Sequence, residues 1–174
     1  FTMEKVDLII NNIGKLATCA SSHKPNRREQ MQDVGIIDNA AVAIKNGSIC
    51  AVGVANTIEA QYSAEQIIDA QGNAVCPGFV DPHTHLIFAG DRIKEFEMHI
   101  RGATYLDIMA AGGGIAFTAQ ATQAASLEQL IAMGKARLNT LLTLGTTTVE
   151  IKSGYGLDGA NEIKMLEAAI QCAA

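Results

Sequence analysis

The sequence predicts an α/β protein in which a small part built of β-strands precedes the first βα units of a parallel sheet. Two observations predict this class. Short apolar runs separated by turn residues fill residues 6–76, whereas longer helical patterns alternate with strands from residue 77 onward. Strands and helices that alternate in this way form βαβ units around a parallel sheet. We therefore expect two parts, residues 1–76 and residues 77–174.

The first part contains the strongest turn signal in the chain. A β-prone run from Val6 to Ile10 opens this part, and Asn46-Gly47 separates the apolar runs 41–45 and 48–52. An Asn-Gly pair between two such runs predicts a β-hairpin, because a type I′ turn needs positive φ at both central residues.

Two further segments of this part are expected to be a loop and a pair of strands. Residues 21–30 are polar and include a proline, which predicts a surface loop. Residues 66–70 and 74–76 flank Gln71-Gly72-Asn73, and we expect them to form a further pair of strands.

The second part begins with residues 79–88, an almost continuous apolar run interrupted by polar side chains. This pattern is typical of a buried parallel strand that ends in a functional site. Ser126 and Gln129 form a capping box that predicts the start of a helix, and Gly145 predicts its end. The expected apolar face of this helix is Leu130, Ile131, Leu138, Leu141 and Leu142.

A strand at 146–151, a loop at 152–158 and a second helix complete the second part. We expect that helix to bury Ile163, Leu166 and Ile170, because these residues recur at helical spacing.

The composition excludes several classes of protein. The formal net charge is −5, and acidic and basic residues are interspersed, so neither nucleic acid nor an anionic membrane is an expected partner. No apolar run is long enough to span a bilayer. The four cysteines form no Cys-x-x-Cys pair, which favours a reducing compartment. We expect a soluble, cytoplasmic protein.

His83 and His85 are the first candidate site residues. They are separated by one residue on the predicted strand, so both side chains project from the same face, with Cα atoms ~6.6 Å apart at a rise of ~3.3 Å per residue. Two imidazoles at this spacing can bind one metal ion. The alternative is a pair of histidines that make ordinary hydrogen bonds. The apolar run and the Asp81-Pro82 pair before them favour the metal site.

Several segments of the chain resemble known enzymes. Residues 77–85, Pro-Gly-Phe-Val-Asp-Pro-His-Thr-His, are similar to the first barrel strand of the amidohydrolase superfamily, which carries two metal ligands. Residues 88–92, residues 102–115 and residues 149–157 resemble, in this order, segments of the imidazolonepropionase family. Gly35-Ile36-Ile37 does so as well, and the resemblance covers essentially the whole chain.

The resemblance implies a fold, an activity and a cofactor. The fold is an N-terminal β-sandwich-like composite domain followed by the first part of a metal-dependent (β/α)8 TIM barrel, which is incomplete here because a closed barrel takes roughly 250 residues. The activity is hydrolysis of the cyclic amide C–N bond of 4-imidazolone-5-propanoate to N-formimidoyl-L-glutamate in histidine degradation. The cofactor is one zinc or iron ion, and the family suggests a homodimer.

The resemblance also assigns three substrate contacts. Arg92 would bind the propionate carboxylate, since a guanidinium matches a carboxylate bidentately. A surface salt bridge is the alternative for this residue. Tyr155, between two glycines just after a predicted strand, could hydrogen-bond the substrate, with packing within the loop as its alternative. Tyr105 would be a further contact, although core packing at a helix start fits it almost equally well.

Other polar features have structural explanations. Gly112-Gly113-Gly114 could bind an anion through backbone N–H groups, but a turn without a ligand is the favoured interpretation. Lys152 is expected to be structural, because the family resembled here binds a single metal. We assign His23 and His99 to solvent or ordinary hydrogen bonds.

A catalytic metal site of this type needs a third protein ligand and a separate acid or base. The resemblance places these on later strands, so we identify no catalytic acid or base within residues 1–174 and expect this segment alone to be inactive. Two alternatives stay open: another amidohydrolase, such as a cyclic amidase or deaminase, and a non-catalytic fragment.

Overall fold

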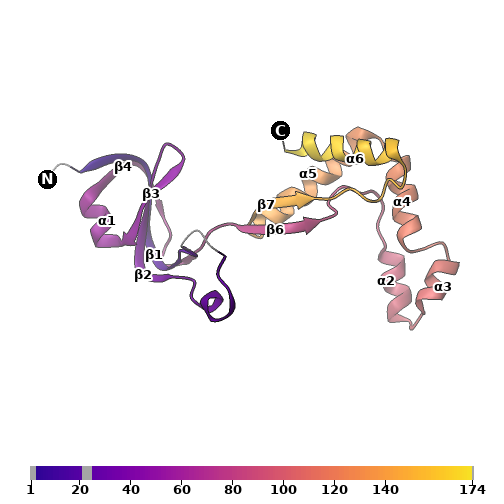
Figure 1. The fold of residues 1–174 in the computed structure, drawn as a ribbon, viewed down its shortest axis with the longest axis horizontal. Helices are drawn as coiled ribbons and strands as arrows, with labels where there is room; N and C mark the ends of the chain where they lie inside the picture. Colours follow the sequence, from indigo (N-terminus) through magenta and orange to yellow (C-terminus); the bar gives the residue numbers. More distant parts are fainter. Residues whose placement is uncertain (1–2, 21–24, 174) are drawn as a thin grey trace. The chain divides into compact units, whose positions relative to one another are not determined.

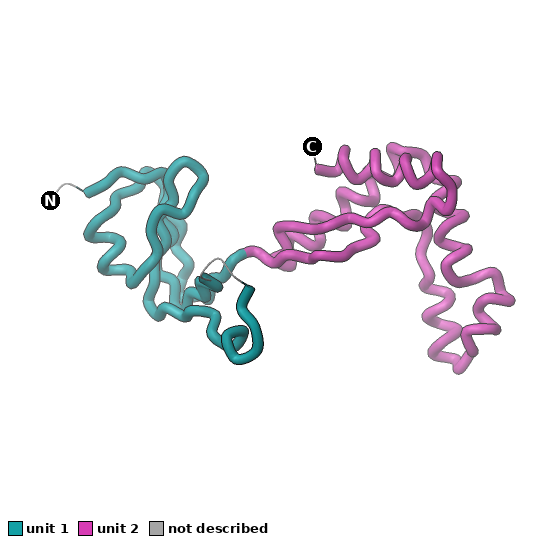
Figure 2. The backbone as a smooth tube through the Cα atoms, in the orientation of Figure 1, with its two compact units in different colours: residues 1–77 teal, residues 78–174 magenta. Residues whose placement is uncertain are grey.

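The computed structural model describes residues 3–20 and 25–173. The chain divides into two compact units, Phe1–Pro77 and Gly78–Ala174 (Figure 2). Each unit has its own apolar core and is described by itself. Within the described ranges, no helix is long and apolar enough to cross a bilayer.

Unit 1 is a mixed β-sheet with one α-helix beside it (Figure 1). Its elements are β1 (Glu4–Ala17), the 3-10 helix η1 (Arg28–Gln32), β2 (Ile36–Lys45), β3 (Ser48–Val54), α1 (Ala55–Gln61), β4 (Tyr62–Asp69) and β5 (Ala74–Val75). The strand order is β3-β2-β1-β4, and β5 also pairs with β1. The core of this unit includes Val6, Ile9, Ile13, Ala41, Ala43 and Ile58.

The predicted hairpin is confirmed. β2 and β3 pair antiparallel, and Asn46 and Gly47 have φ of 53° and 72° as the turn chemistry requires. The Asn46 N–H donates a hydrogen bond of 2.5 Å to the carboxylate of Asp7, which ties the turn to β1.

The strands predicted at residues 66–70 and 74–76 are present as β4 and β5, but they do not pair with each other. Both segments run parallel to β1 instead, with Leu8 opposite Gln66 and Leu16 opposite Val75. The first half of the long strand β1 pairs with β4, and its last residues pair with β5. The turn between β4 and β5 therefore leads from one part of β1 to the next and does not reverse the chain. The Gly72 N–H donates to the carbonyl of Asn12 and holds that turn in place.

The expected loop at 21–30 is only partly described. Residues 21–24, with His23, lie outside the described residues. The remainder is exposed, and its last residues enter η1.

Unit 2 is an α/β unit around two strands (Figure 1). Its elements are β6 (Phe79–Thr84), α2 (Ile93–Ile100), α3 (Tyr105–Ala110), α4 (Ile115–Ala124), α5 (Leu127–Thr143), β7 (Thr146–Ile151) and α6 (Gly159–Cys172). β6 and β7 pair in parallel, and the four helices α2 to α5 form the connection between them. The predicted α/β class with a parallel βαβ connection is therefore confirmed.

The strand predicted at 79–88 is shorter and less buried than expected. β6 ends at Thr84, and the side chains of Phe79 and Val80 are 58% and 64% exposed. The buried part is the segment 86–89 that follows the strand. There the chain leaves β7, and the Ala89 N–H donates to the Thr122 hydroxyl of α4, so the side chains enter the helical core instead of a sheet face.

Helix α5 has the predicted capping box. The Ser126 side chain accepts from the Gln129 N–H, and the Gln129 side chain accepts from the Ser126 N–H. Leu130 is fully buried, and Ile131, Leu138 and Leu141 pack against the core, whereas Leu142 is 59% exposed and was wrongly assigned to the apolar face.

The predicted apolar face of α6 is also wrong. Ile163, Leu166 and Ile170 are exposed, and the core side chains are Met165 and Ala168. The helix packs closely on α5 at Gly134, where an added Cβ would lie 2.7 Å from the sulfur of Cys172 and 2.8 Å from Ile87. The missing side chain at Gly134 permits this approach, which buries Met165 and Ala168 and leaves the three predicted residues exposed.

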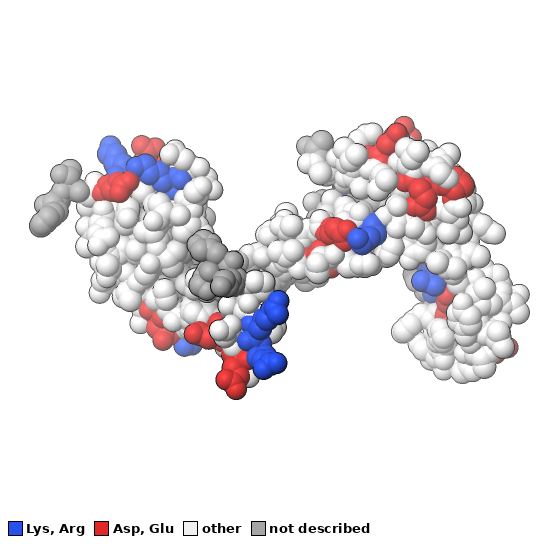
Figure 3. Space-filling model, viewed as in Figure 1, with Lys and Arg blue, Asp and Glu red and all other residues white. Residues whose placement is uncertain are grey.

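Charged side chains are interspersed on both units. Acidic and basic groups occur near one another on the face drawn in Figure 3. Ion pairs join Lys15 to Asp38 and Lys45 to Glu4 at 2.7 Å, and all four side chains are largely exposed. Exposed pairs of this kind contribute little to stability.

The core position of Leu130 provides a test of the packing in unit 2. Replacing Leu130 with Ala should lower the free energy of unfolding by about 2–5 kcal/mol, because it leaves a cavity between α5 and α6. Leu142→Ala on the same helix is the matched control and should change it by no more than about 0.5 kcal/mol. Urea unfolding followed by far-UV circular dichroism measures both. Equal losses for the two variants would contradict this assignment of the core.

Candidate functional site

The two predicted ligand histidines lie together at the end of β6. The ring centroids of His83 and His85 are 5.4 Å apart, with an angle of 69° between the ring planes, and both residues are exposed. Parallel pairing fixes the backbone between them, because the Lys152 N–H donates to the Thr84 carbonyl at 2.8 Å and the Thr84 hydroxyl donates to the carbonyl of Glu150. The carboxyl ends of β6 and β7 therefore meet at the histidine pair.

Tyr155 comes from the loop after β7 and stands against the second histidine. Its ring centroid is 5.5 Å from that of His85 and 6.0 Å from that of Phe88. Gly154 passes close to the imidazole, since a Cβ added there would lie 3.3 Å from Cε1 of His85. Two segments far apart in the sequence thus form one wall of aromatic rings.

Arg92 and Tyr155 line a common cavity of about 260 Å³. Its lining residues are Phe88, Gly90, Asp91, Arg92, Thr118 and Tyr155. The guanidinium of Arg92 lies 3.7 Å from the Glu95 carboxylate, with 46% of the arginine side chain exposed, so the expected alternative of a surface ion pair is present. At 3.7 Å this pair is long, and the partly exposed guanidinium keeps N–H donors available for an anion.

Tyr105 lies apart from this cavity. It is the first residue of α3, behind the N-cap Thr104, and its side chain is 64% exposed. Packing of Tyr105 into the core, which the sequence allowed, is therefore wrong for this structure. The structure does not place Tyr105 among the residues that line the cavity of Arg92 and Tyr155.

The remaining polar features have the structural roles that were expected. Gly112-Gly113-Gly114 forms the turn between α3 and α4, and the Gly114 N–H donates to Glu95 at 2.8 Å. Lys152 pairs with Glu150 at 2.6 Å, and His99 is exposed in the last turn of α2.

Sequence reasoning missed Arg137, which supports the site from α5. One guanidinium nitrogen donates to the carbonyls of Leu86 and Phe88 at 2.9 and 2.8 Å, and the guanidinium carbon lies 3.6 Å from the centroid of the Phe88 ring. Burial lowers the pKa of Arg137. The available signal was its helical spacing, because Arg137 recurs on the same face as Leu130 and Gly134.

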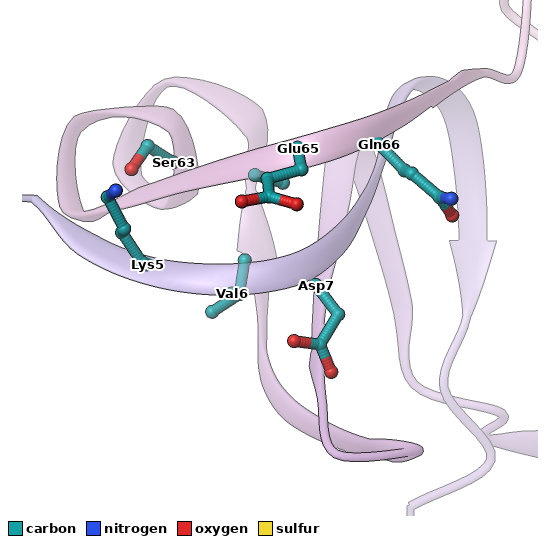
Figure 4. Close-up of a pocket in the computed structure, with 7 residues that line it drawn as sticks. Lys5, Val6, Asp7, Ser63, Glu65 and Gln66 are labelled. Carbon is teal, nitrogen blue, oxygen red and sulfur yellow. The ribbon is translucent and has the colours of Figure 1, made fainter.

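Another cavity, of about 540 Å³, lies in unit 1 between β1 and β4 (Figure 4). Its polar lining includes Lys5, Asp7, Ser63, Glu65 and Gln66. Figure 4 shows the Glu65 carboxylate between the two strands, whereas Asp7 and Gln66 point away from it. These side chains do not converge on one point, so this cavity is a weaker candidate for chemistry.

No group of three or more His, Cys, Asp and Glu residues placed to hold a metal ion occurs within residues 3–20 and 25–173. The histidine pair at the end of β6 supplies two imidazoles.

Comparison with known proteins identifies the class to which this site is similar. Residues 66–111, which include both histidines and Arg92, match the amidohydrolase family. The chain is also 51% identical over 171 residues, 98% of its length, to the imidazolonepropionase of Herpetosiphon aurantiacus. It is 51% identical over 95% of its length to that of Symbiobacterium thermophilum. The resemblance to imidazolonepropionases is thereby confirmed, and the chain spans 39% of the length of each of these relatives.

Two solved structures share the fold. E. coli guanine deaminase matches 95% of this chain and 32% of its own, with a TM-score of 0.61 and 18% identity. A mutant of atrazine chlorohydrolase from Arthrobacter aurescens TC1, crystallised with zinc and atraton, matches 94% of this chain and 33% of its own, with a TM-score of 0.50 and 17% identity. At these identities the likeness shows the fold alone, a mixed α/β fold.

A substitution at Gly154 tests how closely the loop after β7 approaches His85. Gly154 has φ of 138°, and its neighbouring imidazole leaves little space for a side chain. Gly154→Ala should therefore lower the free energy of unfolding by about 1–3 kcal/mol. Gly159→Ala, at the first residue of α6 with nothing within 4 Å of the added Cβ, should be neutral or slightly stabilising. Thermal unfolding of both variants is the measurement, and a neutral Gly154→Ala would disprove the close approach.

Proposed function

We propose that this chain is part of an imidazolonepropionase, an enzyme that hydrolyses the cyclic amide C–N bond of 4-imidazolone-5-propanoate to give N-formimidoyl-L-glutamate in histidine degradation. The observation that carries the proposal is 51% identity to an imidazolonepropionase over 98% of the chain. The grouping of His83, His85, Tyr155 and Arg92 around the end of β6 supports it.

The proposed architecture follows the two units. Residues 1–76 would form part of a β-sandwich-like composite domain, and residues 77–174 would form the first βα units of a (β/α)8 barrel. The parallel pairing of β6 with β7 across a helical connection supports the second assignment. We further propose a homodimer in the cytoplasm, with a small-molecule substrate and without nucleic-acid or membrane partners.

We propose that His83 and His85 hold one zinc or iron ion. The residues fit such an ion, because two exposed imidazole rings with centroids 5.4 Å apart face the same strand end. An ion bound there would lower the pKa of a coordinated water towards ~7 and polarise the substrate carbonyl. Zinc in the atrazine chlorohydrolase that shares this fold supports a metal. The missing ligand and the acid or base would come from outside this segment, which alone would be inactive.

The substrate would lie between the histidine pair and Arg92. The guanidinium would bind the propionate carboxylate through charge-assisted hydrogen bonds, and Tyr155 would hydrogen-bond the ring from the wall of the same cavity. Tyr105 remains a proposed further contact, because its exposed side chain is accessible to a ligand.

Removal of the imidazoles tests the metal site without any assay of activity. In the longer protein proposed above, His83→Asn or His85→Asn should reduce bound metal from about one ion per chain to a small fraction of that, because each variant removes a ligand. His99→Asn, an exposed histidine of α2, is the control and should keep its metal. Elemental analysis after purification without added metal measures the content. Full metal in either ligand variant would refute the assignment.

Replacement of Arg92 tests the substrate class. A hydrogen bond to a charged group contributes about 1.5–3 kcal/mol, so Arg92→Met should raise KM for imidazolone propionate roughly 10–100-fold with a smaller change in kcat. Arg101→Met, which removes an exposed arginine paired with Glu97 in the same helix region, is the control. Steady-state kinetics distinguish the two. An unchanged KM in Arg92→Met would favour another amidohydrolase, such as a deaminase, that has no carboxylate to bind.

A further inference from the structure

The loop that carries Tyr155 is organised around one carboxylate. Glu162, in the first turns of α6, accepts the Gly156 N–H at 2.7 Å and the Leu157 N–H at 2.9 Å through a single oxygen, Oε1. The carbonyl of Gly156 accepts from the side-chain amide of Gln123 at 2.6 Å, so α4 holds the same peptide from its other end. The residue after Tyr155 is therefore fixed by two helices.

The electrostatics agree with this geometry. The pKa of Glu162 lies below its usual range, chiefly because of the Ser153 hydroxyl. Burial of the carboxylate raises this pKa, and the N–H groups of Leu157, Gly156 and Gly154 lower it. The carboxylate is therefore ionised at neutral pH. Successive N–H groups that surround one anion form a nest, an arrangement that fixes a loop when the anion is part of the protein. Leu157 adopts the uncommon φ of 58° as part of this arrangement.

Tyr155 directly precedes the two residues whose N–H groups donate to Glu162. Its ring packs against His85 and Phe88 and lines the cavity with Arg92. Movement of this loop would separate the tyrosine from the imidazole.

We propose that Glu162 is the positioning residue of the site: its carboxylate holds the loop 153–157 so that Tyr155 stands beside His85 and faces the cavity. This inference rests on the proposed function for its catalytic meaning, because Tyr155 is a proposed substrate contact. The positioning itself concerns only residues of unit 2 and can be measured on this chain.

The first experiment follows the loop directly by NMR on the 174-residue chain. In Glu162→Gln, amide hydrogen exchange at Gly156 and Leu157 should accelerate roughly 10–100-fold, as expected for loss of charge-assisted hydrogen bonds. The nuclear Overhauser effects between the rings of Tyr155 and His85 should weaken. Glu167→Gln, on the same helix and exposed, should leave both unchanged. Unchanged exchange and ring contacts in Glu162→Gln would overturn the proposal.

A milder variant keeps the test decisive if Glu162→Gln does not fold. Glu162→Asp shortens the side chain by one methylene, withdraws the carboxylate from the N–H groups of Gly156 and Leu157, and should shift the same amide exchange rates and ring contacts in the same direction by a smaller factor. If Glu162→Asp folds and leaves both the exchange rates and the position of Tyr155 unaltered, the carboxylate is not what holds this loop, and the proposal fails.

A double-mutant cycle in the longer protein tests the effect on catalysis. If Glu162 acts through Tyr155, Glu162→Gln should reduce kcat/KM roughly 10–100-fold in the parent and less than about 3-fold in a Tyr155→Phe background. Equal effects in both backgrounds would show that Glu162 does not act through the tyrosine. A parent protein without any turnover of imidazolone propionate would refute the proposed function, whereas the NMR result would still decide the role of Glu162.

Discussion

The candidate site depends on the parallel pairing of β6 with β7. The last backbone hydrogen bond of this pair, from Lys152 to Thr84, brings the carboxyl ends of two strands to the same edge, although a long helical connection separates them in the sequence. His85 continues from one strand and Tyr155 from the other, so their rings meet only if the register is kept. A slip of one residue would turn the histidines to the opposite face, since side chains alternate along a strand.

Two half-buried charged side chains hold the segments that follow the paired strands. Beyond β6, Arg137 donates to two carbonyls of the chain, and beyond β7, Glu162 accepts two N–H groups. Where a strand ends, its backbone N–H and C=O groups lose their partners in the sheet. Arg137 binds carbonyl groups beyond β6, and Glu162 binds N–H groups beyond β7. The positions of Phe88 and Tyr155 are thus determined by polar contacts from α5 and α6, and their ring contact joins the two systems.

The features that the sequence predicted correctly are local ones. The Asn46-Gly47 turn and the capping box at Ser126 involve residues within a few positions of one another, so their chemistry is readable directly. The spacing of His83 and His85 is local in the same sense. The buried face of α6 was wrong because it depends on the close approach to Gly134 of α5, and the pairing of β4 and β5 was wrong because both lie on β1.

Arg137 and Glu162 were missed for a related reason: both resemble ordinary charged positions of amphipathic helices. Arg137 binds carbonyls of the segment that follows β6. Glu162 binds N–H groups of the loop before α6, and the sequence does not reveal the shape of that loop. All these contacts lie within unit 2, so the placement of His85, Tyr155 and Arg92 is a property of this segment. Two imidazoles cannot by themselves complete a catalytic metal centre, which needs a third protein ligand. For the metal site proposed above, the segment would hold the geometry of the histidine pair, and the third ligand and the acid or base would come from other residues.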